Sequence, residues 1–131
     1  NHNGNFNSCY EMIKLAKKRF PTVKFKCQNL MESPLNNKYD YILASGVFTY
    51  SNSSFFQKCL ELLYSKCNKG IAFNLLADSK KYKNETAQIE FLSNPDDILK
   101  FCKSLSPKVI LKKNYHYRDF SIYMYKDEDI N

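Results

Sequence analysis

Tryptophan, glycine and arginine are scarce in this chain of 131 residues. Tryptophan is absent, glycine occurs three times, and only Arg19 and Arg118 among the 20 basic residues are arginine. A formal charge of +7 suggests a nucleic-acid-binding surface. Arginine, however, is the residue that reads bases and phosphates with a bidentate fork, and the lysines are spread along the chain. The composition therefore favours a solvated basic surface and makes a nucleic-acid partner unlikely.

Long apolar runs and paired metal-binding motifs are also missing. No apolar stretch approaches the roughly 18 residues that a membrane-spanning helix requires, and Asn1–Asn7 carries no signal-peptide pattern. The five cysteines include no C-x-x-C pair, and most fall at apolar-periodic positions. We therefore expect a soluble, cytoplasmic protein with reduced cysteines, no metal site and no membrane partner.

Helix and strand patterns alternate along the first part of the chain. An S-x-x-E capping box beginning at Ser8 predicts the start of a helix that ends at Pro21. Thr22–Cys27 alternates apolar and polar residues, which predicts a strand with one covered face. Tyr39–Ala44 is an apolar run with one acid and is typical of a strand buried on both faces.

The second half continues this alternation. Further helices and strands are expected at Ser53–Lys66, Ile71–Leu76, Asn94–Leu105, Lys108–Lys113 and Phe120–Lys126. Asn68-Lys69-Gly70 is expected to cap the first of these helices in a left-handed conformation. The last two strands have a short connection, which implies an antiparallel hairpin. The pattern predicts one α/β domain over residues 1–131, with a mostly parallel sheet, helices on both faces and a tail at residues 127–131.

Motifs in a fixed order give the chain a family resemblance. M-I-x-x-A-K-x-R-F-P occupies Met12–Pro21, Y-D-x-I-x-A-S-G-V-F occupies Tyr39–Phe48, and Asp119–Tyr125 forms a last strand. Together they resemble the carboxyl-terminal part of class I S-adenosylmethionine-dependent methyltransferases of the small-molecule type. The resemblance implies a Rossmann-like methyltransferase fold, S-adenosyl-L-methionine as cofactor, and methyl transfer to a small-molecule acceptor.

The resemblance also implies an amino-terminal truncation of that fold. The family begins with a strand and a G-x-G-x-G loop that holds the methionine part of the cofactor, and neither is present in this sequence. Residues 1–7 are expected to be the remainder of the second strand, with Asn5 or Asn7 where the family has the acid that holds the ribose hydroxyls. Asn29 stands where another acid lies near the adenine. Asparagine can accept a hydrogen bond but adds no charge, so we expect weak cofactor affinity.

Candidate site residues follow the carboxyl ends of the expected strands, where open parallel sheets bind ligands. By the resemblance, Asn29 and Leu30 line the adenine side. Ser45, Gly46 and Val47 lie near the methionine and sulfonium region, where a glycine lets the backbone approach a ligand closely.

The methyl acceptor is expected over the later strands of the sheet. The resemblance places Tyr50, Asn74, Tyr115 and Arg118 near it, and His116 is the only near-neutral base in this set. His116 is therefore the candidate catalytic residue, with a solvent-exposed hairpin histidine as the alternative.

Two other functional classes remain open. One is a non-catalytic methyltransferase-like remnant that binds a partner or has a structural role, and the other is a basic nucleic-acid-binding module with tyrosines as stacking groups. The family sheet order, 3-2-1-4-5-7-6, places Tyr39–Ala44 as strand 4 beside the missing strand 1. That strand would expose one edge. Two outcomes would relieve this: Thr22–Cys27 pairs beside Tyr39–Ala44 in a rearranged, smaller sheet, or two copies pair or exchange their amino-terminal helix and strand, and we expect the homodimer.

Overall fold

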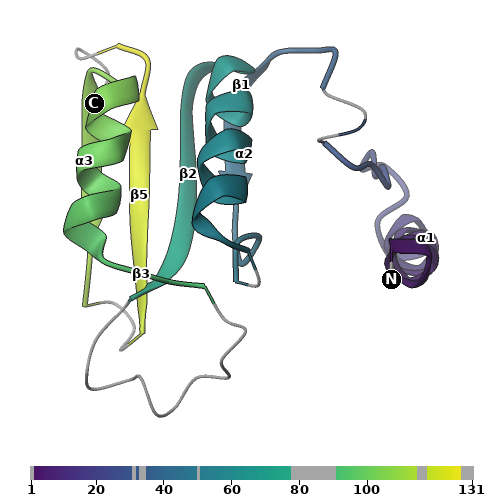
Figure 1. Ribbon diagram of the computed structural model, residues 1–131. Coiled ribbons are helices and arrows are strands. Elements are labelled where there is room, and N and C mark those ends of the chain that lie inside the picture. The colour runs from purple at the N-terminus through teal and green to yellow at the C-terminus, as the bar shows by residue number, and fades with distance from the viewer. Residues whose placement is uncertain are drawn as a thin grey trace. The chain divides into compact units, whose positions relative to one another are not determined.

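Figure 1 shows the computed structural model, which describes residues 2–30, 32, 35–49, 51–77, 91–114 and 118–127. The chain divides into two compact units, Asn1–Leu35 and Asn36–Asn131. The organisation of the whole chain as a single domain stays a prediction.

The amino-terminal unit contains helix α1 (His2–Arg19), which begins earlier than the sequence predicts. Ser8 lies inside the helix, so the prediction that it starts the helix is wrong. The residues before it continue the helical hydrogen-bonding pattern, and the backbone needs no cap at Ser8. Residues 2–7 are likewise helical, and the expected remainder of a strand is not present there.

Residues 22–27 form a turn followed by irregular chain, so the strand predicted at Thr22–Cys27 is wrong. Alternating side chains suit a strand, but a strand exists only where its backbone groups pair with a neighbour. Within the described part of the chain, no strand pairs with this segment.

A disulfide joins Cys9 in α1 to Cys27, which corrects the expectation that all five cysteines are reduced. The irregular segment brings the two Cα atoms to 5.9 Å, within the range that a disulfide spans. Sequence spacing did not reveal this approach, because it depends on how the chain folds back after α1. Cys59, Cys67 and Cys102 are free thiols.

The second unit is an α/β sheet structure. Its elements are β1 (Tyr39–Ala44), α2 (Ser53–Ser65), β2 (Cys67–Ala77), β3 (Leu92–Ser93), α3 (Pro95–Leu105), β4 (Lys108–Lys112) and β5 (Asp119–Tyr125). The strand order is β1-β2-β5-β4, with β3 paired to β2. β5 runs antiparallel to both β2 and β4, while β1 and β3 run parallel to β2. The mostly parallel sheet and the carboxyl-terminal hairpin are confirmed, in the 4-5-7-6 order of the family.

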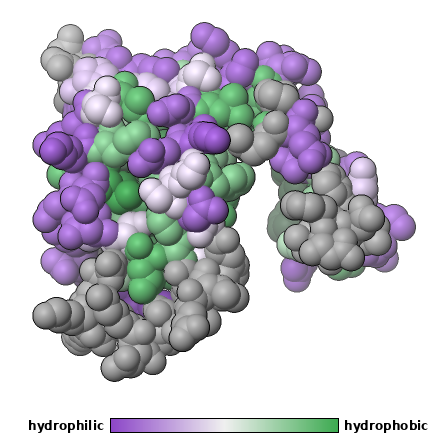
Figure 2. Space-filling model, viewed as in Figure 1, coloured by the Kyte–Doolittle hydropathy of each residue, from purple (hydrophilic) through white to green (hydrophobic). Residues whose placement is uncertain are grey.

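Helices α2 and α3 both lie on one face of this sheet (Figure 1). The core between them and the sheet is aromatic: the ring centroids of Phe48, Phe56 and Phe73 lie 5.0 to 6.1 Å apart, and all three side chains are buried. Such edge-to-face and tilted contacts add to the stabilisation from burial itself. Hydrophilic side chains cover much of the outer surface on this side of the molecule (Figure 2).

The opposite face of the sheet is open beside β1. Successive side chains of a strand point to opposite faces, and Tyr41 and Leu43 lie on the open side with 55% and 81% of their surfaces exposed. Ala44 faces the helices and is buried. The prediction that Tyr39–Ala44 is buried on both faces is therefore wrong, because no element of this unit's described residues covers that face.

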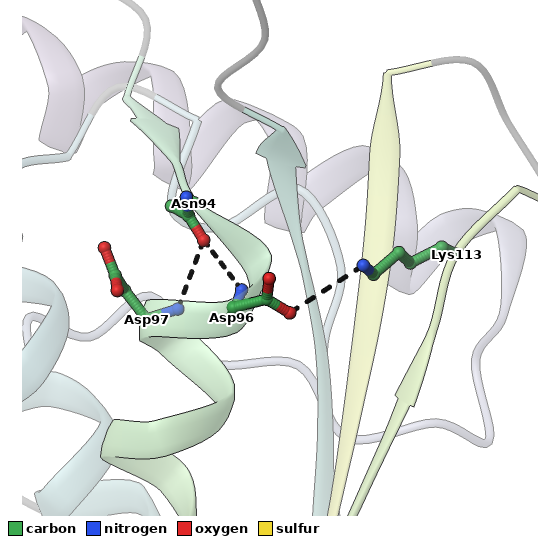
Figure 3. Close-up of polar contacts among 4 residues, drawn as sticks. All are labelled: Asn94, Asp96, Asp97 and Lys113. Carbon is green, nitrogen blue, oxygen red and sulfur yellow. Dashed lines mark hydrogen bonds and ion pairs between the residues drawn. The ribbon is translucent and has the colours of Figure 1, made fainter.

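Local side-chain chemistry explains where the helices of this unit begin and end. Asn94 Oδ1 caps α3 by accepting bonds from the backbone N–H groups of Asp96, at 2.9 Å, and Asp97, at 3.3 Å (Figure 3). Lys66 ends α2, and β2 begins directly after it. Gly70 lies inside β2, so the prediction of a left-handed cap there is wrong. A Cβ at Gly70 would lie 2.7 Å from the carbonyl oxygen of Met124, which explains the glycine.

Candidate functional site

The carboxyl end of β1 lies beside Phe73 of β2, which is in register with Ala44 in the parallel pair, and β2 continues for four more residues to Ala77. The chain leaves β1 through Ser45 and turns at Gly46, whose φ of 69° is in the left-handed region. The Gly46 N–H donates to Asn74 Oδ1 at 2.7 Å. Ser45, Gly46 and Asn74, all selected from the sequence, therefore lie together in the structure.

The turn after β1 is held from several sides. Thr49 Oγ1 donates to the Gly46 carbonyl oxygen at 3.2 Å, and the Phe91 N–H donates to the Thr49 carbonyl oxygen at 2.8 Å. Phe48 is completely buried in the aromatic core. These contacts order the Ser45–Gly46 backbone without any ligand, and such preorganisation lowers the entropic cost of binding.

A cavity of about 170 Å³ opens beside this turn. It is lined by Leu43, Ala44, Ser45, Ala72, Phe73, Asn74, Ser121 and Tyr123. None of these side chains is charged at neutral pH, so binding there would rely on apolar contact with a few hydroxyl and amide groups. The lining is mostly apolar with a few polar groups, as in small-molecule sites, but the volume is below the roughly 300–1,000 Å³ of ordinary ligand pockets, so this hollow would hold only part of a ligand.

Sequence reasoning missed the contribution of β5 to this cavity. Ser121 and Tyr123 enter because β5 pairs with β2 in the register that places them opposite Asn74 and Ala72. The sequence predicts the hairpin of the last two strands but contains no signal for which strand the hairpin joins, or in what register. Thr49, which holds the turn, was also missed.

The remaining candidate residues are distributed over other parts of the chain. The Arg118 carbonyl oxygen accepts a bond from the Ala77 N–H at 2.7 Å, so Arg118 lies at the same end of β2 as Asn74. Val47 is exposed in the turn. Asn29 and Leu30 are half-buried in the amino-terminal unit, and Asn7 lies in α1 of that unit.

Tyr50, Tyr115 and His116 lie outside the described residues. The acceptor-side expectations for them, and the assignment of His116 as the base, therefore stay predictions.

The free thiols of this unit do not belong to the cavity. Burial raises the pKa of the Cys59, Cys67 and Cys102 thiols, that of Cys102 to about 12. A raised pKa keeps these groups protonated and poorly nucleophilic at neutral pH. Within the described ranges, no group of three or more His, Cys, Asp or Glu side chains is arranged to hold a metal ion.

No protein-family model and no curated protein sequence matches this chain. Solved structures do match it. Magnesium protoporphyrin IX methyltransferase (ChlM) from Synechocystis PCC 6803 with bound SAH is similar with a TM-score of 0.68 and 14% identity, over 91% of this chain and 59% of that one. DhpI in its complex with SAH is similar with a TM-score of 0.66 and 16% identity, over 86% of this chain and 60% of that one.

These similarities show the fold. The chain has a class I S-adenosylmethionine-dependent methyltransferase-like fold and spans about three fifths of the length of these structures. None of the helices in the described part is long and apolar enough to cross a membrane.

Proposed function

We propose that this chain is part of an S-adenosyl-L-methionine-dependent methyltransferase that acts on a small-molecule acceptor. The observation that carries the proposal is the fold, shared over 91% of the chain with a methyltransferase bound to SAH. The preorganised Ser45–Gly46 turn at the carboxyl ends of parallel strands supports it, since open α/β sheets bind ligands at that position.

The residues of the turn suit a cofactor that approaches the backbone closely. An added Cβ at Gly46 would meet nothing within 4 Å, so space is open beside the turn. Ser45, Gly46 and Val47 would contact the methionine and sulfonium part of the cofactor. The strands that were expected to place Asn7 and Asn29, at residues 1–7 and Thr22–Cys27, are not formed, so no ribose or adenine contact is proposed for Asn7, Asn29 or Leu30.

The bound cofactor would supply an electrophilic methyl group. The chain's own part in the reaction is to hold the acceptor in line with that group, which is a positioning task. Tyr50, Tyr115 and Arg118 are proposed to bind the acceptor. His116 is proposed to take the proton that the acceptor loses, because an imidazole titrates close to neutral pH.

The experiment is a titration of the isotopically labelled chain with S-adenosylhomocysteine, followed by amide chemical shifts and by calorimetry. We expect shifts centred on Ser45 and Gly46 and a dissociation constant well above 1 μM, the value that corresponds to about −8 kcal/mol. Absence of any shift near the turn at millimolar ligand would contradict the cofactor proposal. A dissociation constant near 1 μM would instead show that a glycine-rich loop is not needed for affinity.

A second candidate function is partner binding by a non-catalytic methyltransferase-like domain, with a second copy of the chain as the first partner to consider. The observation that favours it is the outer edge of β1, which lies at one end of the strand order and pairs with no strand among the residues that the structure describes. An unpaired strand edge is a template for pairing with another chain. If the chain forms a stable dimer and methylates none of the acceptors tested, this function is favoured over catalysis.

A further inference from the structure

Asn74 was expected to contact the methyl acceptor, yet its side-chain oxygen is bonded to the backbone of the turn. The Gly46 N–H to Asn74 Oδ1 distance of 2.7 Å is shorter than the usual 2.9–3.0 Å for such a bond, and it joins residues 28 positions apart. Because the oxygen is the only acceptor of an asparagine side-chain amide, this bond fixes the orientation of the Asn74 amide.

The position of Asn74 explains why a side chain makes this contact. The parallel ladder between β1 and β2 extends to the pair Ala44 and Phe73, and Asn74 is the next residue of β2. At Gly46 the chain turns into the left-handed region and leaves the strand. The Asn74 side chain thus continues the hydrogen bonding between the two chain segments beyond the last residues that pair through their backbones.

We propose that Asn74 is a positioning residue, whose Oδ1 fixes the Ser45–Gly46 turn in the conformation that receives the cofactor. Thr49 Oγ1 holds the other side of Gly46 by donating a hydrogen bond to the Gly46 carbonyl oxygen. Both peptide groups that flank the Gly46 Cα are therefore fixed, one by a β2 side chain and one within the turn. Only the ligand readout of this inference rests on the proposed function, because the state of the turn is measurable without a ligand.

The chain contains a matched control for this bond. Asn68 Nδ2 donates to Asp40 Oδ1 at 3.3 Å and joins the same two strands near their opposite ends, again across 28 positions. Asn68→Ala removes a cross-strand amide contact remote from the turn. Asn74→Ala removes the contact at the turn, and Asn74→Asp keeps an oxygen in place to accept the Gly46 N–H while removing the amide donor.

The first measurement is hydrogen exchange of the Gly46 amide in the free protein, by NMR. Asn74→Ala is expected to lower its protection about fivefold to tenfold, which is what loss of one hydrogen bond of about 1 kcal/mol gives. Asn74→Asp and Asn68→Ala are expected to keep it within twofold. Equal Gly46 protection in the wild type and in Asn74→Ala would overturn the positioning role.

The second measurement is the dissociation constant for S-adenosylhomocysteine in the same variants. Asn74→Ala is expected to weaken binding about tenfold, with Asn74→Asp restored close to the wild type, because the oxygen alone fixes the turn. If Asn74→Asp binds as weakly as Asn74→Ala, the amide donor contacts the ligand directly and the proposal is overturned. If no variant binds, including the wild type, the proposed function fails, while Gly46 exchange still decides whether Asn74 holds the turn.

Discussion

Positions 46 and 70 require glycine for different physical reasons, although Gly46 follows β1 and Gly70 lies in its partner strand β2. At Gly46 the backbone angle excludes most side chains while the surrounding space is open. At Gly70 the backbone angle is ordinary, but an added Cβ would collide with the Met124 carbonyl oxygen of β5. A glycine in sequence predicts neither of these causes by itself, because each depends on the neighbouring strand.

We therefore expect different responses to substitution at the two glycines. Gly46→Ala should lower the free energy of unfolding by about 1–2 kcal/mol, and Gly46→Asn by clearly less, because asparagine tolerates the left-handed region. Gly70→Ala should cost about 1–3 kcal/mol from overpacking, and Gly70→Asn at least as much. Urea denaturation of the four variants measures this. Equal losses for alanine and asparagine at position 46 would contradict the conformational explanation.

The Cys102 thiol makes stability depend on pH in the alkaline range. Burial raises its pKa to about 12 in the folded protein, whereas an unfolded thiol ionises near pH 9. Above pH 9 the unfolded chain loses the proton first, so the stabilisation that is complete below pH 9 is lost as the pH rises toward 12. The expected slope from this group is about 1.4 kcal/mol per pH unit.

Comparison of the wild type with Cys102→Ala isolates this contribution, because the lysines and tyrosines titrate in both proteins. Denaturation between pH 8 and about 10.5 should give a steeper decline for the wild type, whatever the absolute stability of the variant. Parallel stability curves would show that the thiol is not protected in the folded state.

At the scale of single elements, α3 has the best-defined start in the chain. Asn94→Ala should lower the free energy of unfolding by about 1 kcal/mol, because it leaves the first backbone N–H groups of α3 without their acceptor. Asn94→Asp retains the acceptor and should cost only a few tenths of that. Lys113→Gln is the control, since the Lys113–Asp96 pair spans 3.8 Å between exposed side chains and is expected to contribute less than ~0.5 kcal/mol. A larger loss for Lys113→Gln than for Asn94→Ala would refute the capping account.

The elements also show which features can be predicted from the sequence and which cannot. β1 has the predicted bounds, because an apolar run followed by Ser45-Gly46 is consistent with few structures other than a strand that ends there. The Asn94-Pro95 pair predicts the start of α3. The segment at Thr22–Cys27 has an equally clear alternation, but it pairs with none of the strands in the described residues. Alternation reports which side chains would share a face, whereas strand formation depends on a neighbour that the segment itself does not encode.

The candidate site, too, is predicted only in part by the sequence. The rule that ligands bind at strand carboxyl ends selected Ser45 and Gly46, the family resemblance added Asn74, and the structure brings these three residues together. The register between β2 and β5 places Ser121 and Tyr123 beside these residues. The Asn74 side chain accepts a hydrogen bond from the turn, a contact that the sequence does not predict. Register is a long-range property, so these partners follow only from the folded sheet.

At the scale of the whole molecule, the sheet has two edges of different character. β4 forms one edge and contains Lys108 and Lys112, and lysines on an edge strand discourage pairing with another chain. β1 forms the other edge and contains no lysine, while Tyr41 and Leu43 expose apolar surface beside it. Pairing between copies is therefore expected at β1.

We expect the purified chain to form a dimer through β1, with a mass twice the 15.4 kDa of one chain by light scattering. Leu43→Lys places a charge on the open face at the β1 edge, where a partner strand would have to bury it, and should shift the protein to the monomer. Ile110→Lys introduces the same charge at an exposed position of β4 and should leave the dimer intact. A monodisperse 15.4 kDa species for the wild type at high concentration would exclude the dimer. Dissociation by Ile110→Lys but not by Leu43→Lys would place the interface at the other edge, against the argument from lysine content.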